Sequence, residues 1–186
     1  CITPIYTILI SYLYTDYQSC IVMEENKKHQ AFLLQLSNFL RAQSDIVIIS
    51  EQIVRMVGEH LHTARCWISE VFKAEGYSTV GPEHIHPDLT PMAGTFKLSD
   101  YTETMRQLST QAMMVSDTVN DLRFSASEKE LLSALQLHSL LVVALRKEHQ
   151  NIIWALAVAS TTPRQWTDSE QVLLEEVAER TWVAID

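Results

Sequence analysis

The sequence predicts an α+β fold in which a central antiparallel sheet of five or six strands is covered on both faces. Two apolar runs, Leu140–Leu145 and Ile152–Ala159, are joined by a few polar residues and predict a β-hairpin. Segment 81–121 carries most of the prolines and predicts loops and short helices on one face of the sheet. Amphipathic stretches predict the helices that cover the other face, at 28–42, 45–62 and 168–186.

The first 27 residues have an ambiguous pattern. Their spacing of apolar side chains allows a helical stripe, yet their β-branched and aromatic content also allows a strand. We interpret residues 1–27 as an N-terminal extension or interdomain linker, and residues 28–186 as one domain. The stripe consists of Ile5, Leu9, Leu13, Tyr17 and Ile21.

Two strands should follow the second helix, which Ser44 or Asp45 can cap. They are expected at 64–73 and 77–85, on either side of the turn Glu75-Gly76. Alternation along the first strand predicts that Cys66, Ile68 and Glu70 face one way, and that Trp67, Ser69 and Val71 face the other.

The middle of the chain predicts shorter elements. A short strand is expected at 95–98 and another at 112–116. Asp100 can cap a short helix that ends at Ser109, and Ser125 or Ser127 can begin a further helix.

The second strand of the hairpin alternates between large and small side chains. Trp154, Leu156 and Val158 should lie on one face of the sheet and the alanines at 155, 157 and 159 on the other. An alanine face lets a helix or a ligand approach the backbone closely. After the hairpin, Thr167 and Glu170 fit a capping box that begins the last helix.

The order of these elements resembles the C-terminal half of a GAF domain. A strand, a polar turn, a strand rich in small residues, the segment Pro163-Arg164-Gln165-Trp166 and a capped helix follow one another. The resemblance covers about residues 28–186 and is strongest to GAF domains of bacterial two-component sensor proteins. It implies a cytoplasmic, non-catalytic regulatory module that binds a small ligand and relays through its terminal helices. A pocketless GAF-like dimerisation or interaction module is the alternative.

The resemblance also argues against several GAF activities. GAF domains that reduce free methionine sulfoxide use several cysteines, whereas Cys66 is the only one here after residue 20. Phytochrome-like GAF domains attach a bilin to a cysteine in the helix before the hairpin, and residues 121–138 contain none. The signature of cyclic-nucleotide-binding GAF domains is absent from the sequence as well. The cofactor, if there is one, is therefore unknown.

By position, the walls of a GAF pocket would come from aromatic and methionine side chains in the first strand and the middle segments. Core packing is the competing interpretation for each of them. Two polar residues, Arg106 and His138, would orient a ligand in an otherwise apolar site. The apolar candidates for ligand binding are Trp67, Phe96, Tyr101, Met105 and Met113.

Composition limits the other functions. The net charge of −9 disfavours nucleic acid as a partner. Polar residues interrupt the early apolar stretch, so membrane insertion is not expected. The pairs His60/His62 and His84/His86 offer no third ligand nearby, and no nucleophile motif is present, so neither a metal site nor an enzyme is predicted.

The last helix carries more apolar residues than one packed face needs. Leu173, Leu174 and Val177 lie on the arc expected to face the core. Val172, Trp182 and Val183 lie in or beside the charged arc, which predicts a homodimer through the terminal helices.

Overall fold

The protein is described by a computed structural model that covers residues 4–147 and 151–185. Its centre is a six-stranded sheet with strand order β3-β2-β1-β6-β5-β4, in which all neighbouring strands are antiparallel. This confirms the α+β fold class. The strands are β1 (Arg65–Phe72), β2 (Tyr77–Ile85), β3 (Gly94–Lys97), β4 (Met113–Val115), β5 (Ser139–Lys147) and β6 (Asn151–Ser160).

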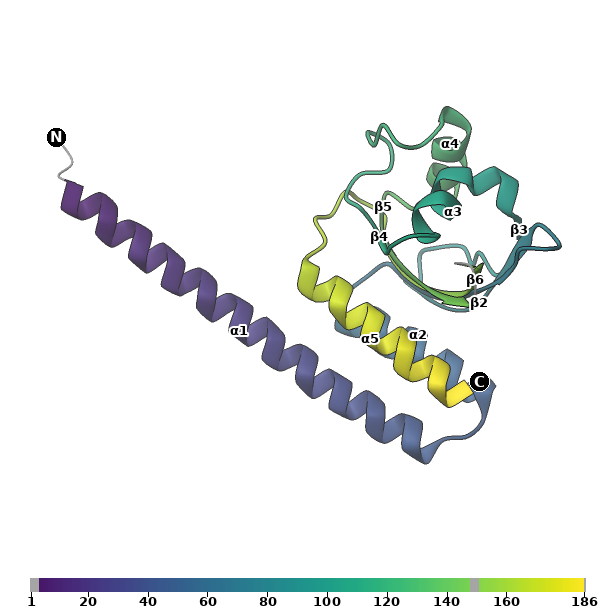
Figure 1. The fold of residues 1–186 in the computed structure, drawn as a ribbon, viewed down its shortest axis with the longest axis horizontal. Helices are drawn as coiled ribbons and strands as arrows, with labels where there is room; N and C mark the ends of the chain where they lie inside the picture. Colours follow the sequence, from purple (N-terminus) through teal and green to yellow (C-terminus); the bar gives the residue numbers. More distant parts are fainter. Residues whose placement is uncertain (1–3, 148–150, 186) are drawn as a thin grey trace.

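Helices cover both faces of the sheet. Figure 1 shows α2 (Ile46–His60) and α5 (Asp168–Ile185) against one face, with α1 (Pro4–Ala42) outside them. The 3₁₀ turn η1 (Leu98–Tyr101), α3 (Thr102–Leu108) and α4 (Ala126–Ala134) lie over the other face. The distribution of helices and loops between the two faces is the one expected from the sequence.

Helix α1 crosses the position where the sequence pattern suggested a boundary. Residues 4–27 continue the helix that was expected to begin at Lys28, because no glycine and no further proline interrupts the chain up to Ala42. Near its middle, α1 reaches the start of α5: the Glu25 carboxylate accepts a hydrogen bond at 3.3 Å from the hydroxyl of Thr167, which precedes α5. The helix before that point projects away from the rest of the molecule (Figure 1).

The expected alternation along β1 and β6 is confirmed. Cys66 and Ile68 of β1 pack with Leu156 and Val158 of β6 in the core beneath α2 and α5. Trp67 lies on the opposite face, in a second apolar cluster that also holds the alanines at 155, 157 and 159. Each of these central strands therefore supplies side chains to two separate cores.

Helix α2 comes unusually close to β2. A Cβ added to Gly58 would lie 2.4 Å from Cδ2 of the His84 ring. The glycine lowers the helix propensity locally, but it lets the imidazole pack against the helix backbone. At its start, α2 is capped by Asp45, whose carboxylate accepts from the amides of Val47 and Ile48.

Helix α5 begins with the predicted capping box. The Thr167 hydroxyl accepts from the Glu170 amide at 3.1 Å, and the Glu170 carboxylate accepts from the Thr167 amide at 2.9 Å. Glu170 also forms an ion pair with Arg164, whose guanidinium lies 4.3 Å from the centre of the Trp166 ring. The Pro-Arg-x-Trp segment therefore fixes the entry into the last helix.

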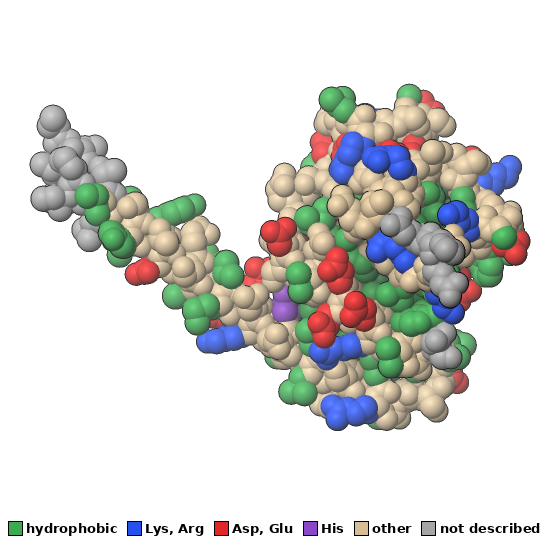
Figure 2. Space-filling model, in the orientation of Figure 1, with side chains coloured by type: hydrophobic (Ala, Val, Ile, Leu, Met, Phe, Trp, Pro, Cys, Tyr) green, Lys and Arg blue, Asp and Glu red, His purple; other side chains and the backbone are tan. Residues whose placement is uncertain are grey.

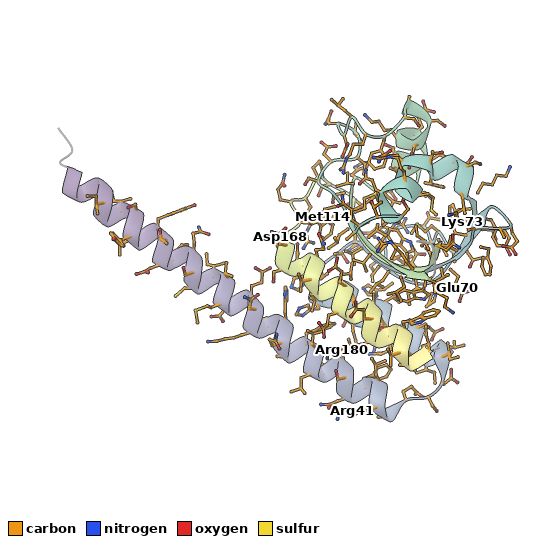
Figure 3. All side chains as sticks on the ribbon, viewed as in Figure 1. Arg41, Glu70, Lys73, Met114, Asp168 and Arg180 are labelled. Carbon is orange, nitrogen blue, oxygen red and sulfur yellow. The ribbon has the colours of Figure 1, made fainter. Side chains whose placement is uncertain are left out.

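The helices α1 and α5 run parallel in contact with each other. Arg180 of α5 points towards α1 in Figure 3 and donates to the Leu33 carbonyl at 3.2 Å and to the Ser37 hydroxyl at 2.5 Å. Nearer the start of α5, the Ser169 hydroxyl lies 3.2 Å from the Asn26 side-chain oxygen.

Trp182, one of the three residues from which a dimer contact was inferred, is partly buried. Its ring lies 6.4 Å from that of Trp154 and packs on the core of its own chain. Val172 and Val183 are exposed, by 60% and 83%.

Candidate functional site

A cavity of about 110 Å³ lies between the sheet and the segments that cover it. Its floor includes Ala155 and Ala157 of β6, whose small side chains leave space above the strand. Leu132 of α4 and Leu108 of α3 contribute from the cover. The small alanine side chains of β6 therefore leave a cavity on one face of the sheet. On the opposite face, the large side chains of the same strand fill the core.

Five of the seven residues expected to bind a ligand line this cavity. They come from separate parts of the chain, and folding brings them together around the same space. They are Trp67 of β1, Phe96 of β3, Tyr101 of η1, Met105 of α3 and Met113 of β4.

Arg106 and His138 lie outside the cavity lining. Arg106 follows Met105 on a helix, so it points about 100° away and pairs with Glu103 at 2.7 Å on the outer surface. His138 precedes β5, where its backbone donates to the Ser160 carbonyl and accepts from the Thr118 amide. Spacing along the sequence could not distinguish a residue facing the cavity from its neighbour facing solvent.

Glu128 organises the cover of the cavity, and the sequence analysis did not single it out. Its carboxylate is 2% exposed and accepts from the amides of Glu103 and Thr104 and from the Thr104 hydroxyl. It therefore caps the start of α3 from α4. The signal was present as Ser125-x-x-Glu128, but the capping box is only half formed: Ser125 accepts from the Glu128 amide while the carboxylate binds α3.

The outer surface of α3 carries a network of charged side chains. Arg123 pairs with Asp121 and donates to the Gln107 side chain at 2.9 Å, and Gln107 donates to Glu103 at 2.7 Å. Hydrogen bonds from Arg106 and Gln107 lower the pKa of Glu103 to about 2. The Arg123 guanidinium also donates to the Met114 carbonyl, which ties this network to β4.

The polar groups of the cavity lining are hydroxyls. Ser69 of β1 lies opposite Val80 of β2, and Ser78 lies opposite Val71. The two serines are therefore diagonal neighbours on the same face of the sheet, close enough to contact one ligand. Burial, followed by the nearby Asp100 and Glu128, raises the pKa of Tyr101, so its phenol stays protonated.

The other chemically active side chains lie away from this cavity. Cys66 is buried on the opposite face of the sheet, and burial raises the pKa of its thiol. His62 and His86 are exposed, and His60 stacks on Phe32 at 4.2 Å. Within residues 4–147 and 151–185, no three His, Cys, Asp or Glu side chains form a cluster suited to a metal ion. None of the helices in the same ranges has the length and apolar character needed to span a membrane.

Solved structures share this fold. One is a phycoerythrobilin-bound GAF domain from a cyanobacterial phytochrome, 17% identical, with a TM-score of 0.70 over 84% of this chain and 93% of that one. Another is a far-red absorbing dark state with bound biliverdin IXa, 17% identical, with a TM-score of 0.71 over 82% and 96% of the two chains. A third is the free methionine-R-sulfoxide reductase of Neisseria meningitidis with its substrate, 13% identical, with a TM-score of 0.65 over 84% and 87%.

Sequence comparison gives the family directly. No curated protein matches the chain significantly. The profile of the GAF domain matches residues 45–185, from the cap of α2 to the end of α5. The chain therefore belongs to the GAF domain family.

Proposed function

We propose that this GAF domain is the non-catalytic regulatory module of a bacterial two-component signalling protein and senses a small ligand in the cavity above β6. The observation that carries the proposal is the pair of cores that β1 and β6 share. A ligand that contacts Ala157 presses on a strand whose next residue, Val158, packs beneath the terminal helices. A ligand that prefers one pose of those helices would shift their equilibrium.

The bilins bound by two of the similar structures do not fit this chain. Residues 121–138 contain no cysteine for covalent attachment. The cavity of about 110 Å³ is smaller than the roughly 150 Å³ of an engineered cavity that binds benzene. A linear tetrapyrrole has several times the volume of one such ring. We therefore expect a colourless protein with another ligand.

An enzymatic role lacks the necessary groups. The methionine sulfoxide reductase among the similar structures is the relevant comparison. In this chain, the cavity lining contains no cysteine or histidine among the described residues, and Cys66 lies on the other side of the sheet with a raised pKa. A thiol of that kind is a poor nucleophile because the thiolate is the reactive form.

Native mass spectrometry tests the sensor function. The chain, purified without denaturation, should carry a mass adduct that is lost on denaturation. The variant Ala157→Leu, which places a side chain in the cavity, should lack the adduct, whereas Ala42→Leu at the exposed end of α1 should keep it. An adduct retained by Ala157→Leu would place the ligand elsewhere and contradict the proposal.

We also propose that two copies of the chain associate through α1. Ile10, Leu13 and Tyr17 are 62%, 61% and 63% exposed on the part of the helix that projects from the domain. With Cys20 they repeat every three or four residues, the spacing of a coiled-coil seam. Figure 2 shows mainly hydrophobic and uncharged side chains along this projection, and Asp16 is the single charged residue from position 4 to 23.

Disulfide cross-linking tests this contact. A parallel pair of α1 helices places the two exposed Cys20 side chains across the seam, so mild oxidation of a Cys1→Ser variant should give a covalent dimer. Moving the thiol with Cys20→Ser and Ser19→Cys turns it about 100° away and should abolish the product. A monomer in sedimentation at high concentration, or equal cross-linking from both positions, contradicts the interface.

A further inference from the structure

The lining of the cavity contains no Asp, Glu, Lys, Arg or His among the residues that the structure describes. Its walls are mainly the side chains of Leu, Val, Met and aromatic residues. Transfer of a charged group into such surroundings is strongly unfavourable unless a counter-charge or several hydrogen bonds compensate it. The lining therefore discriminates against ions of either sign.

Three charged residues of the cover, Glu128, Arg106 and Arg123, already have partners. The Glu128 carboxylate accepts three hydrogen bonds from α3. Arg106 pairs with Glu103, and Arg123 pairs with Asp121, both on the outer surface of the cover. Recruiting any of these side chains as a counter-charge would break the contacts that hold the cover in place.

The polar side chains of the lining are Ser69, Ser78, Tyr101 and Thr104, and the Thr104 hydroxyl already donates to Glu128. The hydroxyls of Ser69 and Ser78 lie on adjacent strands, and neither makes a side-chain hydrogen bond with the described part of the chain. Towards β5, Leu140 and Val142 supply apolar walls. The cavity thus has largely apolar walls, and at β1 and β2 two hydroxyls without other side-chain partners can donate or accept a hydrogen bond.

We propose that the cavity takes an uncharged, largely apolar ligand of about one aromatic ring, with a single polar group directed at Ser69 and Ser78. This inference rests on the proposed sensor function and specifies the class of its ligand. The volume of about 110 Å³ compares with roughly 150 Å³ for the engineered apolar cavity that binds benzene. Amino acids, nucleotides and carboxylic acids are excluded by their charge.

Matched probes of one ring test the charge rule. Phenol is neutral at neutral pH, benzoate is an anion and benzylammonium is a cation. Each is titrated into the full chain while the chemical shifts of backbone amides are followed by NMR. Phenol should saturate with a Kd of about 1 mM, and the two ions should bind at least about tenfold more weakly. Shifts should cluster at β1, α3 and β6.

Three variants test where phenol binds and which groups it contacts. Ala157→Leu should abolish binding of phenol, whereas the exposed Ala42→Leu should leave it unchanged. The double variant Ser69→Ala, Ser78→Ala should weaken the affinity for phenol by about fivefold. Its affinity for benzene, titrated in the same way, should not change, because benzene cannot form a hydrogen bond with the hydroxyls.

The outcomes separate this inference from the proposed function. Benzoate or benzylammonium binding in the cavity as tightly as phenol overturns the charge rule and leaves ligand sensing intact. Loss of benzene and phenol binding by the same factor in the double serine variant overturns the role of the hydroxyls. If no probe binds the full chain and no adduct is seen in native mass spectrometry, both the inference and the sensor function are wrong.

Discussion

The two faces of the sheet differ in how completely they are filled. On the face beneath α2 and α5, Leu156 and Val158 of β6 are fully buried among residues of three helices. On the other face, Ala155 and Ala157 of the same strand are just as inaccessible, yet they border a cavity. Low exposure therefore does not mean dense packing. What separates the faces is side-chain size along one strand.

Truncating one leucine to alanine on each face of the sheet should give the largest difference in the free energy of unfolding. Leu156→Ala removes a side chain that is surrounded on all sides, and should lower the free energy of unfolding by about 3–4 kcal/mol. Leu140→Ala removes one that borders existing space and has fewer contacts to lose, so about 2 kcal/mol is expected. Urea denaturation measures both. Equal losses would show that the cavity is closed in solution.

Enlarging two neighbouring residues of β6 that face opposite sides of the sheet should change the free energy of unfolding by different amounts. Val158→Leu adds volume to the packed face and should cost about 1–3 kcal/mol of stability. Ala157→Leu adds volume to the cavity and should leave the free energy of unfolding within about 1 kcal/mol of the parent. Thermal unfolding of the two variants side by side distinguishes these outcomes. A larger loss from Ala157→Leu than from Val158→Leu would reverse the comparison.

A smaller, pH-dependent effect on stability is expected on the face covered by α2 and α5. Burial, and then the neighbouring His29 and His62, lower the pKa of His60 from 6.5 to about 4. Between pH 6.5 and 4, His60 binds a proton in the unfolded chain but stays neutral in the folded one. The free energy of unfolding therefore has its full value above pH 6.5 and falls as the pH drops towards 4. Because the ring is only half-buried, we expect about 1 kcal/mol.

The control for this pH effect is His60→Gln, which removes the titrating group from the end of α2. Its denaturation midpoint should vary less between pH 6.5 and 4 than that of the parent chain. If the two chains lose stability in parallel over this range, His60 is not responsible.

Much of the fold follows from periodicity in the sequence. The strand pattern of β1 and β6 gives their faces correctly, because side chains alternate strictly along a strand. The candidate site is only partly predictable: Met105 and Arg106 are adjacent, and which of them faces the cavity is set by how α3 packs on the rest of the fold. The start of α3 is held by Glu128, which is at least 22 residues further along the chain. The start of α1 was ambiguous because its apolar spacing allows a helix while its β-branched and aromatic residues are also typical of a strand.

The contact of Glu128 with the start of α3 has a kinetic consequence. One buried carboxylate accepts from the amides of Glu103 and Thr104, so these protons can exchange with solvent only when Glu128 releases α3. Release of one helix leaves the buried carboxylate without its three hydrogen-bond donors, which makes separate opening of α3 and α4 costly. The two helices should therefore open as a single cooperative unit, and the rate of that opening, rather than diffusion, should limit how fast a ligand enters and leaves.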